Sequence, residues 1–357
     1  MRGRPTGRRA LTQLKTLAED GDVDAQCRLG SYYFEEACRP REGVKWLKLA
    51  AEQGDACAQY NLALSYESGD GTRKNMKQAV RWYRAAAEQE DGSAQLNLGI
   101  CYGQGRGVKQ DFREAMRWFR KAAKQGNRNA QHNLGMYYDD GRGVRVNRRL
   151  AVHWHERAAE QGDPNSQVFV GYSYFYGEGV RRNRKKALMY YRKASRRGSD
   201  SAQINIAQCY LCGDVVERNP KRALLWLHKS AEQGNIRAQF WIGHTYWWGD
   251  GVRRDYRRAF EWFRKAAKQG DAEAQCYVGI CYHDGLGTRK SIKTSLNWYR
   301  LAAKGNDSYA QYCLGLCYLD ADGVRKNRAH ARAWLEKALA NGEKQAKKEL
   351  GRLKKQA

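Results

Sequence analysis

The chain has 357 residues, of which 42% are hydrophobic, 11% aromatic and 29% charged, and its formal net charge is +27. This composition supplies enough apolar side chains for a buried core, which excludes a largely disordered chain. No apolar run is long enough for a secretory signal or a membrane span, so we expect a cytoplasmic protein without a transmembrane segment.

The sequence repeats itself with a period of about 36 residues, and this repetition replaces the two or three globular domains that the length alone would suggest. The marker is the dipeptide Ala-Gln, with Ser166-Gln167 in the one slot where alanine is missing; its alanines are Ala25, Ala58, Ala94, Ala130, Ala202, Ala238, Ala274 and Ala310. About nine tandem units of this length predict an all-α solenoid, an αα-superhelix of helix-turn-helix repeats.

The chain begins with a basic N-terminal tail, residues 1–9, and the solenoid is predicted over residues 10–357. Residues 10–22 resemble a lone second helix that precedes the first complete unit. The first repeat departs from the pattern, because the stretch from Tyr33 to Glu42 has no Gly-x-Gly-Val turn and carries Pro40 instead.

The spacing within a unit predicts a first helix, for example from Ala130, Leu134, Gly135 and Tyr138. These residues recur at three-to-four-residue steps and form one small and apolar stripe, in which the glycine permits close helix contact.

A turn and a second helix follow in each unit. Gly141 and Gly143 supply the permissive backbone of the turn, and Val144 is expected to pack back onto the core. The second helix ends at Gly162, and we expect its inner face to consist of Ala151, Trp154, Ala158 and Ala159.

The end of the chain, residues 343–355, resembles a lone first helix that is rich in lysine. Each helix pair leaves an apolar face uncovered, so a stack needs polar ends. This helix is therefore predicted to cap the solenoid.

The units resemble Sel-1-like repeats, which are relatives of the tetratricopeptide repeat. The resemblance rests on Ala-Gln-x-Asn-Leu-Gly, Tyr-x-x-Gly-x-Gly-Val and Ala-x-x-Trp-[Tyr/Phe]-Arg-Lys-Ala-Ala, repeated over residues 10–357. It implies a right-handed αα-superhelix with a concave groove and an adaptor or scaffold role in protein complexes. It also leaves open a bacterial effector delivered by a specialised secretion system.

One secreted branch of that family carries a cysteine pair in each unit. The matching positions here hold Ala51 with Gln59, Ala87 with Gln95 and Ala123 with Gln131, so the resemblance does not extend to that branch.

The resemblance to tetratricopeptide proteins also implies that the residue two before the inner glycine grips a partner's backbone. Those residues are Asn61, Asn97, Asn133 and Asn205. An asparagine offers both a donor and an acceptor, although the same amide could instead bond a neighbouring helix end or loop.

In other repeats this column is occupied by Phe169, Trp241, Tyr277 and Cys313, and nearby positions add Tyr172, Phe240 and Tyr312. Trp247 and Trp248 are expected in the turn of the same repeat as Trp241. Aromatic side chains outside the required core indicate either a binding surface or a locally repacked core.

Lysine and arginine concentrate in the six residues that follow each turn, and the stacking of repeats should align them as a basic ridge along one edge. Candidate ridge residues are Arg145, Arg148, Arg149, Arg181, Arg182, Arg184, Lys185, Lys186, Arg253, Arg254, Arg257 and Arg258. Such a ridge could meet an acidic protein segment, nucleic-acid phosphates or an anionic membrane, or serve solubility alone.

No phosphate-binding glycine loop of the Walker type occurs, and each Gly-x-Gly belongs to a turn between helices. The pairs Cys209/Cys212, Cys313/Cys317 and His153/His155 are interpreted as packing, and the cysteines as free thiols. We therefore expect no enzymatic activity, cofactor, metal or small-molecule substrate. The leading hypothesis is an adaptor that binds another protein or peptide, with an acidic partner among the candidates; the alternative is a nucleic-acid-associated protein.

Overall fold

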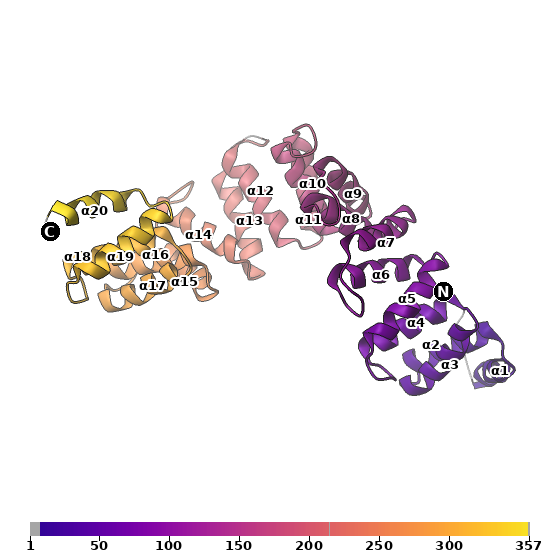
Figure 1. Cartoon of the computed structure of the whole chain (residues 1–357). Helices are drawn as coiled ribbons and strands as arrows, with labels where there is room; N and C mark the ends of the chain where they lie inside the picture. Colours follow the sequence, from indigo (N-terminus) through magenta and orange to yellow (C-terminus); the bar gives the residue numbers. More distant parts are fainter. Residues whose placement is uncertain (1–7, 214, 356–357) are drawn as a thin grey trace. The chain divides into compact units, whose positions relative to one another are not determined.

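The computed structural model describes residues 8–213 and 215–355, which are entirely helical apart from turns (Figure 1). The chain divides into two compact units, Met1–Asn183 and Arg184–Ala357, and each is described by itself. The helices of the first unit are α1 Arg8–Glu19, α2 Val23–Glu35, α3 Pro40–Glu52, α4 Ala56–Ser68, α5 Met76–Glu88, α6 Gly92–Gln104, α7 Phe112–Lys124, α8 Arg128–Asp140, α9 Arg148–Glu160 and α10 Pro164–Tyr176.

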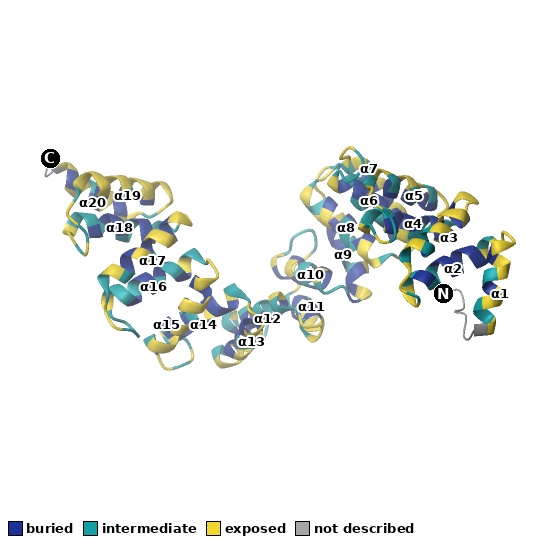
Figure 2. Cartoon of the chain, turned by 90° about the horizontal axis from the view of Figure 1, so that it is seen from below, coloured by how far each residue is buried: buried dark blue, intermediate teal, exposed yellow. Residues whose placement is uncertain are grey.

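The second unit continues the same alternation of first and second helices. Its helices are α11 Arg184–Arg196, α12 Asp200–Cys212, α13 Pro220–Glu232, α14 Ile236–Trp248, α15 Tyr256–Lys268, α16 Ala272–Asp284, α17 Ile292–Lys304, α18 Ser308–Asp320, α19 Arg328–Ala340 and α20 Gln345–Lys355. Within each unit, consecutive helices pack against one another in chain order. Figure 2 shows the buried residues on the helix sides that face these neighbours.

The first helices begin and end with local signals in the sequence. Asp91 precedes α6, and its carboxylate accepts a 2.7 Å hydrogen bond from the backbone N–H of Ala94. Gly105 follows the helix with φ 70°, a left-handed conformation that glycine adopts without steric cost. The first helices α4, α8, α10, α12, α14 and α16 also have a capping side chain before them and a left-handed glycine after them, so each is held to 13 residues.

In most repeats the core pairs a glycine on the first helix with a large side chain on the second, while α4 and α12 carry Ala63 and Ala207 at this position. A Cβ added to Gly99 would come within 2.6 Å of the Phe119 ring, and Gly243 bears the same relation to Phe263. The inner glycines therefore permit close helix contact, as predicted. The inner face of the second helix needs a correction, because Trp154 is only half-buried while the next residue, His155, is fully buried.

In most turns a second glycine sets the contact between consecutive repeats, while the turn after α12 carries Val215 at this position. Gly143 has φ 70°, and a Cβ there would lie within 2.6 Å of the carbonyl carbon of Phe112 in the preceding repeat. The turn can therefore rest on the start of the preceding second helix only if it carries no side chain at this position. Val144 packs on the neighbouring apolar cluster, as the sequence predicts.

Buried glutamine amides connect the repeats. Gln131 donates from Nε2 to the carbonyl of Ala123 in the preceding repeat, 3.2 Å away. Its Oε1 accepts a 2.8 Å hydrogen bond from Gln161 of its own repeat, which also donates to Gly126. We call this arrangement the glutamine ladder; the pairs that share the second hydrogen bond are Gln53–Gln26, Gln89–Gln59, Gln125–Gln95, Gln161–Gln131, Gln233–Gln203 and Gln269–Gln239, with Asn341–Gln311 at the end.

Both ends of the described part of the chain are helical. Of the predicted basic tail, residues 1–7 lie outside that part, while Arg8 and Arg9 begin α1. The lone helix expected within residues 343–355 is α20, whose Ala346 and Leu353 are buried against Leu335 and Ala338. Its Lys347, Lys348 and Lys354 are exposed, which is the arrangement that a terminal cap requires.

One expected position is wrong. Trp247 and Trp248 do not lie in the turn, because α14 runs through Trp248 and the left-handed cap is Gly249. Both residues therefore have helical geometry, and their side chains point in directions fixed by the helical period.

Candidate functional site

One face of every first helix is left open by the packing, and it is formed by helix positions six, nine and thirteen. We call it the 6-9-13 face; in α4 it consists of Asn61, Leu64 and Ser68. None of the residues at these positions is buried in α4, α6, α8, α10, α12, α14, α16 or α18. In the first unit, these three residues line a hollow of about 170 Å³ together with Ser31 and Glu35 of α2, so the faces of adjacent repeats join.

In the second unit this face is aromatic at α14. Trp241 and Trp248 are 37% and 62% exposed, although large aromatic side chains usually lose most of their surface to packing. His244 lies between them, with ring centroids 5.4 Å from Trp241 and 6.1 Å from Trp248. The three rings form a continuous stripe, which is a surface suited to an apolar or aromatic side chain of a partner.

In the first unit the same positions of α10 carry Phe169, Tyr172 and Tyr176. Tyr172 and Tyr176 are 43% and 48% exposed, and their ring centroids lie 4.5 Å apart. The sequence analysis singled out the first two residues and missed Tyr176. The signal was available, because Tyr176 occupies the same position of its repeat as Trp248.

Other aromatic candidates lie deeper in the structure. Phe240 is buried, with its ring 5.7 Å from that of Phe263, so it belongs to the core rather than to an open groove. Trp247 is half-buried, and its ring centroid lies 5.0 Å from Tyr256 and 5.3 Å from Tyr277. Tyr277 itself stacks on Phe263 at 4.5 Å. Tyr277 is the sixth residue of α16 and so lies on the 6-9-13 face, where its ring and that of Phe240 lie beside His244 of the stripe.

Near the end of the chain, Tyr312 and Cys313 of α18 are both partly exposed. Tyr312 packs against the cluster that anchors α20. The capping helix therefore covers part of the surface predicted for Tyr312.

The four candidate asparagines are all half-buried on the 6-9-13 face. Asn61 directs its amide toward the Cys57 sulfur at 3.7 Å, and the amide of Asn97 interacts with the Tyr60 and Tyr83 hydroxyls. Asn133 and Asn205 make no side-chain hydrogen bond within the described residues. Two of the four amides therefore have donors and acceptors available to a ligand.

The candidate ridge residues lie in the linkers and at the starts of second helices. Arg145 and Arg149 in the first unit and Arg253 and Arg254 in the second are exposed. Some of the others have acidic neighbours: Arg148 lies 3.5 Å from Glu178, and Arg258 lies 3.4 Å from Asp255. Four further candidates are exposed: Arg181, Arg182, Lys185 and Arg257. The remaining two, Arg184 and Lys186, are half-buried.

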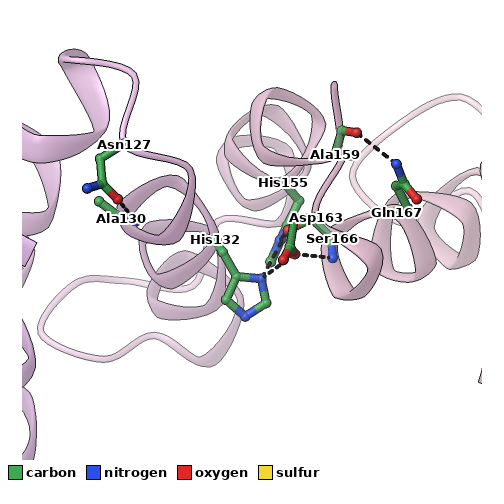
Figure 3. Close-up of polar contacts among 8 residues, drawn as sticks. All are labelled: Asn127, Ala130, His132, His155, Ala159, Asp163, Ser166 and Gln167. Atoms are coloured by element: carbon green, nitrogen blue, oxygen red, sulfur yellow. Dashed lines mark hydrogen bonds and ion pairs between the residues drawn. The ribbon is translucent and has the colours of Figure 1, made fainter. Parts of the chain in front are cut away.

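The sequence analysis missed a polar cluster inside the first unit (Figure 3). Ser166 Oγ lies 3.0 Å from Nδ1 of His132 and 3.0 Å from Nδ1 of His155. His132 Nδ1 is also 3.1 Å from a carboxylate oxygen of Asp163, which caps α10. The one sequence signal was Ser166 itself, which replaces the alanine of the Ala-Gln dipeptide.

Burial controls the ionisation of this cluster. Burial beside His132 lowers the pKa of His155 to about 3, so this imidazole is neutral at physiological pH. Burial opposes ionisation of Asp163 as well, but hydrogen bonds from His132 and Ser166 hold its pKa well below the usual range. Asp163 is therefore a stable anion within the stack.

Serine, histidine and aspartate are the residue types of a nucleophilic triad, but the geometry does not suit catalysis. Ser166 has 0% exposure, so no substrate carbonyl can approach its hydroxyl. Among the described residues the Nε2 atom of His155 has no hydrogen-bond partner; it is buried and faces Gly135, not solvent. The cluster is a polar connection between two repeats.

Most cysteines are similarly enclosed. Burial raises the pKa of Cys101 to about 11 and of Cys281 to about 12, so both thiols are protonated and poorly nucleophilic. Cys38, Cys57 and Cys212 are the exposed thiols. No described helix has the length and apolarity needed to cross a membrane.

Two kinds of feature define the class of this protein: 13-residue helix pairs stacked through glycines and glutamines, and an open face on the first helices. The class is a helical repeat solenoid. Nine matches to the Sel1 repeat account for most of the chain, at residues 23–55, 58–91, 92–127, 128–163, 164–199, 200–235, 236–271, 272–307 and 308–343. The chain belongs to the Sel1 repeat family, whose members generally mediate protein–protein interactions and whose fold is typically non-enzymatic.

Solved structures show the same architecture. The protein is similar to c5321, a protective antigen of uropathogenic Escherichia coli strains with an SLR fold: the TM-score is 0.71 at 34% identity, over 96% of this chain and 82% of that one. A Sel1 repeat protein from Oxalobacter formigenes also gives a TM-score of 0.71, at 30% identity over 85% of this chain and 89% of that one.

Curated relatives match only short stretches. DAP3-binding cell death enhancer 1 of Mus musculus is 36% identical over 76 residues, which is 21% of this chain and 15% of the relative. The F-box protein At1g70590 of Arabidopsis thaliana is 40% identical over 62 residues, 17% of this chain and 18% of the relative. The match thus spans less than a fifth of either relative.

Proposed function

We propose that this protein is an adaptor that binds an extended segment of another protein along the 6-9-13 face. The observation that carries the proposal is the exposed stripe of Trp241, His244 and Trp248 on α14. Exposed tryptophans impose a solvation cost unless a partner covers them, and tryptophan is enriched among the residues that dominate binding energy.

The position of this face within each unit supports binding of an elongated ligand. Neighbouring first helices come close to one another, α2 with α4 in the first unit and α16 with α18 in the second. The 6-9-13 faces of successive repeats therefore adjoin, as the shared hollow between α2 and α4 illustrates. A chain lying across them would meet polar positions such as Asn133 and aromatic positions such as Tyr172 in turn.

The charge of the chain favours an acidic partner. Exposed Arg253 and Arg254 follow Trp248 by a few residues, beyond the turn. An acidic residue next to an apolar anchor could then contact both the stripe and the linker, and the positive field would speed association. The proposed ligand is an acidic segment with an apolar or aromatic anchor.

The test is an affinity purification of the tagged protein from its own cells, performed with and without nuclease and followed by mass spectrometry. Recovery of a stoichiometric protein after nuclease treatment supports the adaptor. If nucleic acid is recovered without nuclease and every protein is lost after nuclease treatment, the basic linkers rather than the 6-9-13 face would carry the function.

Matched variants then test whether the partner binds at the 6-9-13 face. Trp241→Ala and Trp248→Ala should each weaken binding at least tenfold, because each removes an exposed aromatic anchor. The control is Leu225→Ala, since Leu225 is 65% exposed but lies on the second helix α13. Equal affinity of all three variants would contradict the proposed face.

The alternative function is binding to nucleic acid. It is favoured by the exposed arginines of the linkers, and it predicts that affinity falls steeply as salt is added. A partner that stays bound through a rise from 50 to about 200 mM salt argues against phosphate contacts as the main source of affinity.

A further inference from the structure

Three metal-ligand groups meet where the first repeat joins the second. Cys27 lies on α2, Asp55 caps the start of α4, and Cys57 is in the first turn of α4. The two sulfur atoms and a carboxylate oxygen of Asp55 all lie within 4.8 Å of one another. The sequence analysis expected no metal, and it did not consider this group, whose two cysteines lie thirty residues apart on different helices.

The surroundings hold these groups in place and leave one side open. Cys27 is buried in the cluster that contains Leu47 and Leu62, so its sulfur has a fixed position. Asp55 accepts a 2.7 Å hydrogen bond from the backbone N–H of Ala58, which fixes its carboxylate. Cys57 is exposed, so an ion can enter from solvent.

The repeat pattern does not require this combination. The equivalent pairs at the following junctions of the first unit are Tyr60 with Ser93, Leu96 with Asn129 and His132 with Asn165. At the junction of the repeats that contain α16 and α18, the equivalent pair is Cys276 with Tyr309. The junction of Cys27 and Cys57 is the one place in the sequence where both positions are cysteine.

We propose that Cys27, Cys57 and Asp55 bind a thiophilic divalent cation of the Zn²⁺ type, with water as the fourth ligand. Two thiolates and a carboxylate are a donor set that suits zinc, and a tetrahedral site places its ligand atoms about 3.3–3.8 Å apart. The observed limit of 4.8 Å requires only a small movement of the exposed Cys57 side chain. The ion would tie the atypical first repeat, which lacks the glycine turn, to the rest of its unit.

A second group, His283 with Cys317 and Asp322, has a simpler explanation. Nε2 of His283 lies 2.7 Å from Asp322, and Nδ1 lies 2.5 Å from Asp284, so the imidazole already bridges two carboxylates. Glu67 and Arg106 pair at the equivalent positions of two earlier repeats. This arrangement is an ion pair between repeats, and it carries no metal proposal.

Cobalt(II) is the probe for the proposed site, because thiolate coordination gives it a charge-transfer band and tetrahedral geometry gives visible d–d bands. The full chain, reduced and stripped of metal with a chelator, is titrated with Co²⁺ and then with Zn²⁺. We expect the bands to saturate at one equivalent and to disappear as Zn²⁺ displaces the probe. Zn²⁺ should also raise the melting temperature of the wild type.

Two variants and two matched controls assign the ligands. Cys57→Ser should abolish the thiolate band, and Asp55→Asn should weaken Co²⁺ binding at least tenfold while asparagine keeps the helix cap. Cys212→Ser removes another exposed thiol, and Asp91→Asn changes the same cap one repeat later; both should bind as the wild type does.

The proposal is overturned if the wild type gives no thiolate band at equimolar Co²⁺. It is equally overturned if the band survives undiminished in Cys57→Ser, because the thiolate would then come from elsewhere. Helix content and melting of the metal-free variants are measured alongside, and since Cys57 is exposed, its substitution should leave both unchanged.

Discussion

Gln161 donates a 2.8 Å hydrogen bond from Nε2 to Oε1 of Gln131, on the first helix of the same repeat. Gln131 is buried, and its own amide is committed to the carbonyl of Ala123. The pair therefore links two helices of one repeat to the last turn of the repeat before it.

Gln161→Ala should destabilise the first unit by about 1–3 kcal/mol, because it leaves the buried Oε1 of Gln131 without a donor. Chemical denaturation followed by circular dichroism measures the change. Gln104→Ala is the control, since Gln104 is exposed at the end of α6, and it should change stability by less than about 0.5 kcal/mol. Equal effects of the two variants would show that the ladder contributes little.

Ala321 caps α18 in the left-handed region, with φ 62° and ψ 31°, where the earlier first helices from α4 onward end in glycine. Ala321→Gly should stabilise the last repeat by about 1 kcal/mol, because an L side chain is strained in this conformation. The reverse change, Gly285→Ala at the cap of α16, should destabilise by a similar amount, since its new Cβ meets nothing closer than 3.4 Å. Hydrogen exchange of α18 and α16 measures both changes, and effects of the same sign would contradict the explanation.

His155 should make the first unit sensitive to acid. Burial lowers its pKa to about 3 in the fold, while the unfolded chain takes up a proton near pH 6.5, so stability falls as the pH drops between these values. The expected loss is roughly 2 kcal/mol between pH 7 and pH 5. Asp163 adds a loss only below about pH 4, because its folded pKa is depressed.

His155→Phe installs the aromatic type that Phe119 and Phe263 supply in other repeats, and it should remove most of the pH dependence between 7 and 5. His153→Gln is the control, because His153 is exposed on the same helix. Denaturation midpoints at several pH values test the prediction. An unchanged slope in His155→Phe would place the acid sensitivity at another group.

Reversing the charge of Arg253 and Arg254 to glutamate should weaken binding of an acidic partner about tenfold or more at low salt, and the difference should shrink as salt is added. The control makes the same total change of charge at Lys268 and Lys304, which are exposed at the ends of second helices in the same unit. Equal losses in both pairs would indicate a response to net charge rather than to the linker.

The sequence predicted the helices well, because their boundaries depend on local signals such as the glycine pair at 141 and 143 and the 36-residue spacing of alanine. The prediction for Trp247 and Trp248 was wrong because the template turn was taken to begin too early, while the left-handed residue that ends α14 is Gly249. The aromatic stripe was visible in part, since Trp241 stands in a column that other repeats fill with asparagine.

The polar contacts in the interior could not be predicted from the sequence pattern. Ser166 stood out as an exception, but its two histidine partners come from different helices, α8 and α9, and no spacing rule joins them. Cys27 and Cys57 escaped notice for the same reason. Contacts of this kind depend on how one repeat packs against the next, and only the three-dimensional structure gives that packing.

The second glycine that most turns carry, which packs without a side chain on the preceding repeat, constrains how this protein can change in length. Gly143 reaches Phe112 and Gly179 reaches Arg148, in both cases in the repeat immediately before. A deletion of a few residues between such a glycine and its contact would move that glycine away from the contact and bring a side chain against the neighbouring backbone. Loss or gain of one whole unit keeps every remaining glycine next to its contact in the preceding repeat. Tandem duplication and excision of whole units are therefore the changes in length that this architecture tolerates.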